Sequence, residues 1–171
     1  MLGLYVHIPF CRRKCNYCDF VSSPANGELI TRYVEALCLE MKRYEREKIS
    51  TIYVGGGTPS VLSKENIAAL FSGIYKTFDC SETREITVEG NPESLDFEKL
   101  VVLKSLGVNR LSIGVQSFDD AELARLGRVH SVKDFVNCFG NARVLGFKNI
   151  GLDLNNGLSG QSFWQSGNVG Y

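Results

Sequence analysis

The chain has 171 residues, of which 44% are hydrophobic and 22% charged, a balance typical of a globular protein with one domain. Lysine plus arginine equals aspartate plus glutamate, 19 each, so no net charge attracts nucleic acid or an anionic membrane, and we expect no nucleic-acid partner. The N-terminus lacks the charged leader of a signal peptide, and no apolar run reaches the length of a membrane span. We therefore expect a cytoplasmic protein. Its six cysteines are then metal ligands, reactive groups or core residues in preference to disulfides.

The hydrophobic pattern predicts five short strands that alternate with amphipathic helices. A β-rich run at 4–8 comes first, and apolar residues between 28 and 46 then recur on one helical face. Further strands are predicted at 51–56, 85–90, 110–116 and 149–154. Further helices are predicted at about 63–78, from Ser94 or Asp96 to Gly107, and as a pair whose second member runs from Ser131 to Gly146.

This alternation predicts an α/β fold with parallel strands joined by right-handed crossovers. Two architectures remain open at this stage, a doubly wound open sheet and a full or partial barrel. Both bind ligands at the C-terminal ends of the strands, where the polar and glycine-rich segments of this sequence cluster. Because the strands are rich in β-branched residues, we also expect both faces of the sheet to be covered.

Three cysteines, Cys11, Cys15 and Cys18, lie within eight residues, directly after the first strand. The loop that carries them also holds the basic run 12–14, which is not the composition of a protein core. The other three cysteines are isolated, and we expect them to be small buried residues; they are Cys38, Cys80 and Cys138.

Three thiolates in one loop favour an iron–sulfur cluster over zinc. A four-ligand zinc site needs a second ligand pair, which is absent, and we expect His7 to pack or to hydrogen-bond inside its strand. Three thiolates on a four-iron cluster leave one iron without a protein ligand, and that iron is a coordination site for a substrate or cosubstrate. The neighbouring cations stabilise thiolates and an anionic cluster.

The spacing C-x3-C-x2-C after a first strand, with Tyr17 just before the third cysteine, resembles the signature of the radical S-adenosylmethionine (SAM) enzymes. The resemblance implies a [4Fe-4S] cluster held by Cys11, Cys15 and Cys18, with SAM chelating the open iron. In that family an electron from the reduced cluster cleaves SAM to a 5′-deoxyadenosyl radical. The implied fold is a partial (β/α)6 TIM-like barrel, of which about five β/α units are present in this chain.

The segment "VGGGTPS" at 54–60 lacks the Gly-Lys-Ser/Thr ending of a phosphate loop. By composition alone it is a tight turn that leads toward a helix. In the radical SAM family, the similar G-G-G-T-P segment implies a close approach of the backbone to the methionine amino group of SAM.

Six motifs occur here in an order similar to that in oxygen-independent coproporphyrinogen III oxidases and their heme-chaperone relatives of the HemW type. They are "LYVHIPFC", "CDF", "GGGTPS", "TVEGNPES", "GVQSF" and "GLDL". The resemblance covers residues 3 to about 161. It implies SAM contacts at Tyr5, Tyr17, Gly56, Gly57, Thr58, Glu89, Gln116, Arg128 and Asp153.

The residues after Cys18 favour one branch of this family. The oxidases usually carry a further cysteine in C-x-C form, whereas Asp19 and Phe20 follow here and resemble the heme chaperones. The implied function is binding of the cluster and SAM together with binding and transfer of heme. The alternative is an enzyme, an oxidase that decarboxylates coproporphyrinogen propionates. Implied partners are heme or porphyrin and a reducing protein such as a flavodoxin or ferredoxin, with membrane contact only through heme acceptors.

The end of the chain departs from the family pattern. Ser159 stands where the family motif G-L-P-G-Q has proline, and the tail is rich in Gly, Ser, Asn and Gln without a helical face. We expect residues 1–161 to form an incomplete radical SAM core and 162–171 an irregular tail, with the sixth unit and a C-terminal domain missing. A further alternative is therefore an inactive truncated fragment, whose fifth strand is an exposed edge.

Overall fold

The computed structural model describes residues 2–24, 26–44, 46–158 and 160–161. Five parallel strands form one sheet in the order of the sequence: β1 (Leu2–Ile8), β2 (Ile49–Gly56), β3 (Glu85–Gly90), β4 (Arg110–Gln116) and β5 (Asn149–Leu154). A doubly wound sheet reverses its strand order once, and this sheet does not. Of the two predicted architectures, the structure is thus the partial barrel, and within the described residues the sheet is not closed.

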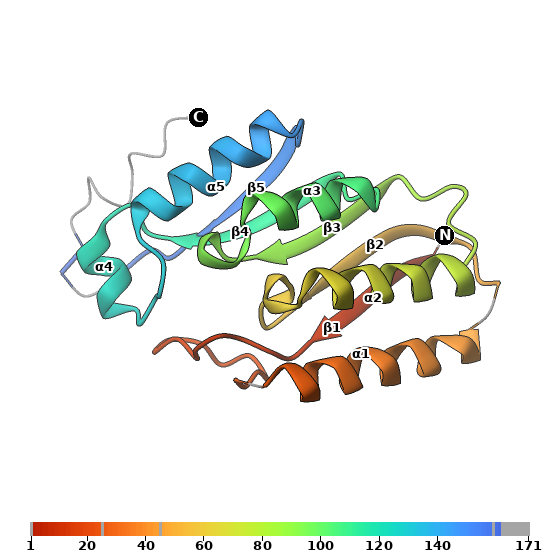
Figure 1. Ribbon diagram of the computed structural model, residues 1–171. Helices are drawn as coiled ribbons and strands as arrows, with labels where there is room; N and C mark the ends of the chain where they lie inside the picture. Colours follow the sequence, from red (N-terminus) through yellow and green to blue (C-terminus); the bar gives the residue numbers. More distant parts are fainter. Residues whose placement is uncertain (1, 25, 45, 159, 162–171) are drawn as a thin grey trace.

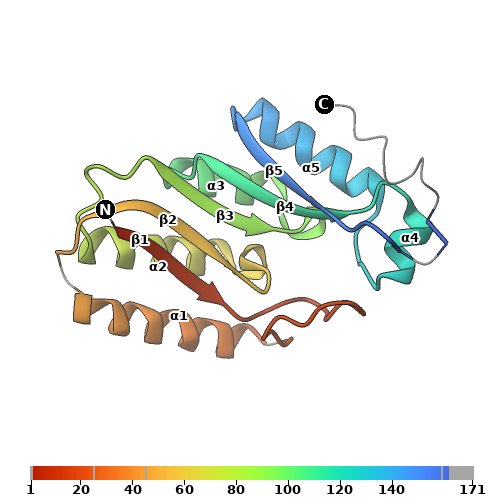
Figure 2. The same ribbon diagram turned by 180° about the vertical axis from the view of Figure 1, so that it is seen from behind.

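The helices lie on one side of the sheet. Figure 1 shows helices such as α2, α3 and α5 in front of the strands, with α4 beyond the strand ends, and Figure 2, from behind, shows the strands in front. They are α1 (Gly27–Met41), α2 (Lys64–Thr77), α3 (Phe97–Ser105), α4 (Asp120–Arg125) and α5 (Val132–Val144), with short 3-10 turns η1 (Lys42–Tyr44), η2 (Pro59–Val61) and η3 (Pro92–Ser94). None of the helices described is long and apolar enough to cross a membrane.

Most helix boundaries agree with the sequence prediction, and one does not. Asp96, not Ser94, is the N-cap of α3, since its side chain accepts a hydrogen bond from the backbone of Lys99. Ser131 and Asp134 form the predicted capping box of α5. The first helix, predicted to reach residue 46, ends at Met41. The chain continues as the 3-10 turn η1, and Arg46, with a positive φ of 71°, then donates its amide to Thr77 O ahead of β2.

The two faces of the sheet differ in chemistry. Alternate residues such as Ile52, Val88 and Ile113 are buried against the helices and form the core. The residues between them are polar or aromatic, and Tyr5 on the first strand is 56% exposed. The expectation that both faces are covered is therefore wrong for the described residues. The apolar residues fill one face, while the other face carries mainly polar groups.

The prediction that the isolated cysteines are buried is confirmed for Cys138 and holds only in part for Cys38 and Cys80. Cys138 is buried in the core, and burial, with a smaller contribution from Glu93, raises the pKa of its thiol to about 12. Cys38 and Cys80 are partly buried against the core, and burial raises the pKa of both thiols. None of these three is an activated thiol.

The fifth strand lies at an edge of the described sheet and is partly exposed along its length. This agrees with the expected edge position. Ser159 and the tail 162–171, to which two sequence predictions refer, lie outside the described residues.

Candidate functional site

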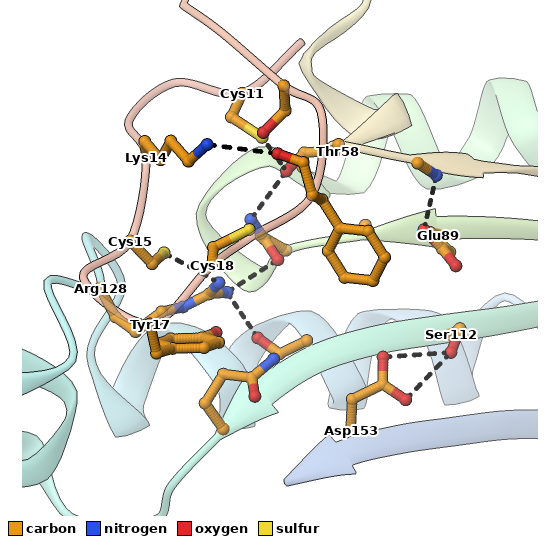
Figure 3. A pocket seen from close by; sticks show the side chains of 18 of the residues that line it. Cys11, Lys14, Cys15, Tyr17, Cys18, Thr58, Glu89, Ser112, Arg128 and Asp153 are labelled. Atoms are coloured by element: carbon orange, nitrogen blue, oxygen red, sulfur yellow. Dashed lines mark hydrogen bonds between the residues drawn. The ribbon is translucent and has the colours of Figure 1, made fainter. Parts of the chain in front are cut away.

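A cavity of about 450 Å³ lies at the C-terminal ends of the strands. Its size is that of a site for a small molecule or cofactor. Figure 3 shows the three cysteines and Arg128 on one side of it and polar side chains from the strands on the other. Every predicted site residue lines this cavity: Tyr5, Cys11, Cys15, Tyr17, Cys18, Gly56, Gly57, Thr58, Glu89, Gln116, Arg128 and Asp153.

The glycine run after β2 holds the start of the cysteine loop by backbone contact. The amide of Gly57 donates to Ile8 O at 2.8 Å, and that of Thr58 donates to Phe10 O at 2.7 Å. A Cβ on Gly57 would lie 2.7 Å from Phe10 O and 2.9 Å from Phe10 N. Glycine is required here because two backbone segments touch, a reason that the motif alone did not supply.

The base of the cysteine loop is closed by a short backbone pairing. Cys11 N donates to Ser23 O at 3.2 Å, and Ser23 N donates to Pro9 O at 3.0 Å. The hydroxyl of Thr58 donates to Cys11 Sγ at 3.3 Å. The first cysteine is thus fixed at the end of β1, and a hydroxyl donor faces its sulfur.

Arg128 connects the cysteine loop to the sheet (Figure 3). Its Nη2 donates to Asn91 Oδ1 and to the carbonyl of Gly114, each at 2.7 Å, and its Nη1 lies 3.6 Å from Cys15 Sγ. A Cβ on Gly114 would lie 2.7 Å from Asn91 Oδ1, so the glycine leaves room for this contact. Arg128 therefore places a guanidinium donor beside the second cysteine of the loop.

Arg128 is backed by two largely buried side chains, His130 and Glu93. His130 Nδ1 lies 3.4 Å from Glu93 Oε2, and His130 Nε2 lies 3.1 Å from Val115 O. Burial by itself would raise the pKa of Glu93, but the hydrogen bond from His130 and the charge of Arg128 outweigh burial, and the pKa lies below its ordinary value of 4.5. Glu93 is therefore a carboxylate that stabilises the cationic side of the site.

Glu89 is fixed on the opposite side of the cavity. Tyr53 donates its hydroxyl to Glu89 Oε1 at 2.5 Å, and Gly56 N donates to Glu89 Oε2 at 3.0 Å. Burial and the neighbouring Glu89 raise the pKa of Tyr53, which stays a neutral donor. Each carboxylate oxygen can accept a further hydrogen bond, so Glu89 remains able to bind a ligand ammonium or hydroxyl.

Further side chains close the cavity. Ser112 donates to both carboxylate oxygens of Asp153, at 3.4 and 3.3 Å. Gln116 follows a β-bulge and has a φ of 70°, a conformation that is strained for a non-glycine residue.

Tyr17 is 41% exposed, and burial raises the pKa of its hydroxyl, so its neutral ring is available for stacking. Tyr5 hydrogen-bonds to His7 Nδ1 at 2.8 Å, as expected for a histidine within its strand.

The three thiols are a donor set of the kind that holds an iron–sulfur cluster. Within the described residues, no three His, Cys, Asp or Glu side chains converge closely enough to hold one metal ion. A cluster spreads its iron atoms over a larger volume, and the three thiols border one cavity with a hydroxyl and a guanidinium as their neighbours. The buried Nε of Arg128 has no hydrogen-bond partner among the residues that the structure describes.

The prediction missed several cavity residues. Asn91 belongs to a motif that was recognised, yet its role in orienting Arg128 depends on a contact 37 residues away. Tyr53 precedes Gly55 by two positions in β2, so both lie on one face of the strand. This spacing was the available signal that Tyr53 faces the site. Ser112, Gly114 and Leu154 also line the cavity.

Replacing Gly57 with alanine should destabilise the protein, because the new Cβ would press on the Phe10 backbone, which cannot give way as a flexible side chain can. We expect a loss on the order of 2 kcal/mol in the free energy of unfolding. Gly140→Ala is the matched control: a Cβ there meets none of the described atoms within 4 Å, and alanine favours the helix by up to about 1 kcal/mol. Equal stabilities of the two variants in denaturant unfolding would contradict this account of the glycine run.

Replacing Glu93 with glutamine should weaken the pH dependence of stability in acid. The folded pKa of Glu93 is lowered, so its contribution is complete above the unfolded value and is lost as the pH falls through the folded pKa, below 4.5. Denaturant unfolding from pH 6 to pH 3 should therefore show a shallower decline for Glu93→Gln than for the wild type. Glu35→Gln, which changes an exposed side chain of α1, is the control. An identical decline in all three proteins would show that Glu93 does not contribute.

Comparisons with known proteins agree with this site. Residues 5–166 match the Radical SAM superfamily. The chain is 44% identical over 167 residues to the heme chaperone HemW of Bacillus subtilis (strain 168), covering 95% of this chain and 44% of that protein. It is 38% identical over 166 residues to the heme chaperone HemW of Escherichia coli (strain K12), covering 94% of this chain and 44% of that protein.

Among solved structures, the coproporphyrinogen III oxidase HemN from Escherichia coli, a radical SAM enzyme, superimposes with a TM-score of 0.83. The sequence identity is 30%, over 89% of this chain and 36% of that chain. This chain thus spans less than half the length of the relatives it matches. The family match extends over most of the chain, from within β1 to beyond β5, and on this ground the chain belongs to the radical SAM superfamily.

Proposed function

We propose that this chain is the cluster- and SAM-binding part of a heme chaperone of the HemW type. The single observation that carries the proposal is that three cysteines and the predicted SAM contacts, from the cysteine loop and all the strand ends, line one cavity. Separate motifs in a sequence do not require this convergence. It is the expected arrangement if one ligand touches all of them.

In this proposal Cys11, Cys15 and Cys18 hold a [4Fe-4S] cluster. When bound, the cluster supplies one electron and an iron atom open to coordination. The protein supplies the setting: Thr58 donates to one sulfur, and Arg128 places a positive charge beside another. Both contacts place a hydrogen-bond donor beside a ligand sulfur, and hydrogen bonds to the sulfurs tune an iron–sulfur cluster.

The cavity offers separate contacts for the parts of SAM. A carboxylate is matched by the Arg128 guanidinium, which lines the cavity. An ammonium group or ribose hydroxyls are matched by Glu89, and further polar groups by Asp153 and Gln116. Tyr17 presents an aromatic ring for the adenine. Glu89, held by Tyr53 and Gly56, is rigid before the ligand arrives, which lowers the entropic cost of binding.

The chaperone is favoured over the oxidase by the residues after the third cysteine. Phe20 occupies the second position after Cys18, lines the cavity and is 67% exposed. An exposed ring there gives a flat apolar ligand such as heme a surface to contact, whereas a cysteine would add a thiol. The higher identities to relatives that are named heme chaperones agree with this choice. Oxidation of coproporphyrinogen is the second candidate, favoured by the structural similarity to HemN.

An acidic electron-transfer protein of the flavodoxin or ferredoxin kind is the proposed reductant. Arg12, Arg13 and Lys14 are all exposed on the cysteine loop, so a negatively charged partner would be attracted toward the cluster. The proposed setting is the cytoplasm, as expected from the reduced cysteines. Contact with a membrane would occur only through a heme acceptor.

The test begins with anaerobic reconstitution with iron and sulfide. Wild-type protein should take up about four irons per chain, the content of one [4Fe-4S] cluster. Cys15→Ser should retain far less, because a hydroxyl is a poor iron ligand. Cys80→Ser, at a thiol outside the cavity, should match the wild type in iron content. Equal iron in both variants would contradict the proposed cluster site.

The reconstituted protein also separates the candidate functions. Titration with heme should give a saturable change in the heme absorbance at one heme per chain if this part holds the heme site. Consumption of coproporphyrinogen III with SAM would instead favour the oxidase. Iron uptake without binding of heme or SAM would favour the inactive fragment.

A further inference from the structure

Asn16 lies between Cys15 and Tyr17, and no part of the proposed function uses its side chain. The loop that carries it, residues 12–22, leaves the end of β1 and returns at Ser23. Cys15 and Cys18 lie inside this loop, beyond the backbone pairing that fixes Cys11. Something must hold the outer part of the loop if these two thiols are to face the cavity before any ligand is present.

Asn16 makes two hydrogen bonds to a distant part of the chain. Its backbone amide donates to Leu126 O at 3.0 Å, and its side-chain Nδ2 donates to Arg125 O at 2.9 Å, across a sequence separation of 109 residues. Both acceptors are carbonyl groups at the C-terminal end of α4, which ends at Arg125 with Leu126 as its C-cap.

These carbonyls need partners that the helix cannot give. The last carbonyls of any helix lack an amide one turn later. At the end of α4, Arg128 N donates to Leu123 O at 2.9 Å, and Gly127 N donates to Ala124 O at 3.0 Å, which is the Schellman pattern. The carbonyls of Arg125 and Leu126 remain, and Asn16 takes both. The cysteine loop therefore completes the C-cap of α4.

Gly127 adds a steric reason for this fit. It has a φ of 75°, and a Cβ there would lie 3.1 Å from Asn16 Oδ1 and 3.3 Å from Asn16 Nδ2. The amide of Asn16 thus lies against the bare face of the glycine. One residue further on, Arg128 reaches Cys15, so neighbouring residues of the loop contact neighbouring residues of the α4 end.

We propose that Asn16 is a positioning residue, which clamps the cysteine loop to the end of α4 and so sets Cys15 and Cys18 around the cavity in the cluster-free protein. Cys18 is included because its amide donates to Cys15 O at 3.2 Å, which couples the two thiols. The inference rests on the proposed function only for the identity of the group that the thiols bind. The clamp itself is a property of the cysteine loop without a bound cluster.

The test compares three variants with the wild type. Asn16→Ala removes the side-chain hydrogen bond and keeps the backbone one. Asn16→Asp preserves the shape but directs a negative group at carbonyls of a helix C-terminus, where negative charge is unfavourable. Asn137→Asp makes the same chemical change at an exposed position of α5 and is the matched control.

Two readouts are measured. Amide hydrogen exchange of the cluster-free protein should rise at residues 15–18 and 125–128 in the Asn16 variants and nowhere else. Loss of cluster absorbance to an iron chelator should be roughly five-fold faster for Asn16→Ala, the effect of one hydrogen bond of about 1 kcal/mol, and faster still for Asn16→Asp. The control should match the wild type in both.

The outcomes distinguish a local clamp from a general structural role. Unchanged exchange and unchanged cluster loss in both Asn16 variants would overturn the proposal. So would a rise in exchange throughout the chain with a lower melting temperature, which would make Asn16 a general structural residue. If the wild type takes up no iron, the proposed function fails, and the exchange measurement still decides whether the clamp exists.

Discussion

The Arg128 guanidinium is the contact on which the geometry of the site depends. It joins three parts of the chain that are distant in sequence: Asn91 at the end of β3, Gly114 in β4 and Cys15 in the cysteine loop. A single cation therefore orients the loop against the sheet. His130 and Glu93 behind it are largely buried and limit its freedom to turn away.

The parallel sheet makes this convergence possible. All five strands run in one direction, so the residues that follow them gather at the C-terminal ends of the strands. The helices cover the apolar face of the sheet. The apolar face supplies stability, and the polar face and strand ends supply the site. Two close backbone approaches, at Gly57 against Phe10 and at Gly127 against Asn16, then fix the cysteine loop at its base and at its outer part.

The sequence predicted the parts of this protein that depend on local patterns. Strand positions follow from short apolar runs, helix starts from caps such as Ser131, and the cysteine site from ligand spacing. What it missed depends on contacts between distant segments. Arg46, after the early end of α1, bonds to Thr77, and the clamp at Asn16 joins residues 109 positions apart. Such contacts have no periodicity, so no pattern in the sequence indicates them.

The central claim is that three thiols of one loop hold a four-iron cluster and leave one iron for an outside ligand. Mössbauer spectroscopy of protein reconstituted with ⁵⁷Fe tests it most directly, because each iron environment contributes its own signal. The account predicts that SAM changes the signal of one iron among four and leaves the others nearly unchanged. Four irons that do not respond to SAM, or iron bound as isolated ions, would contradict it.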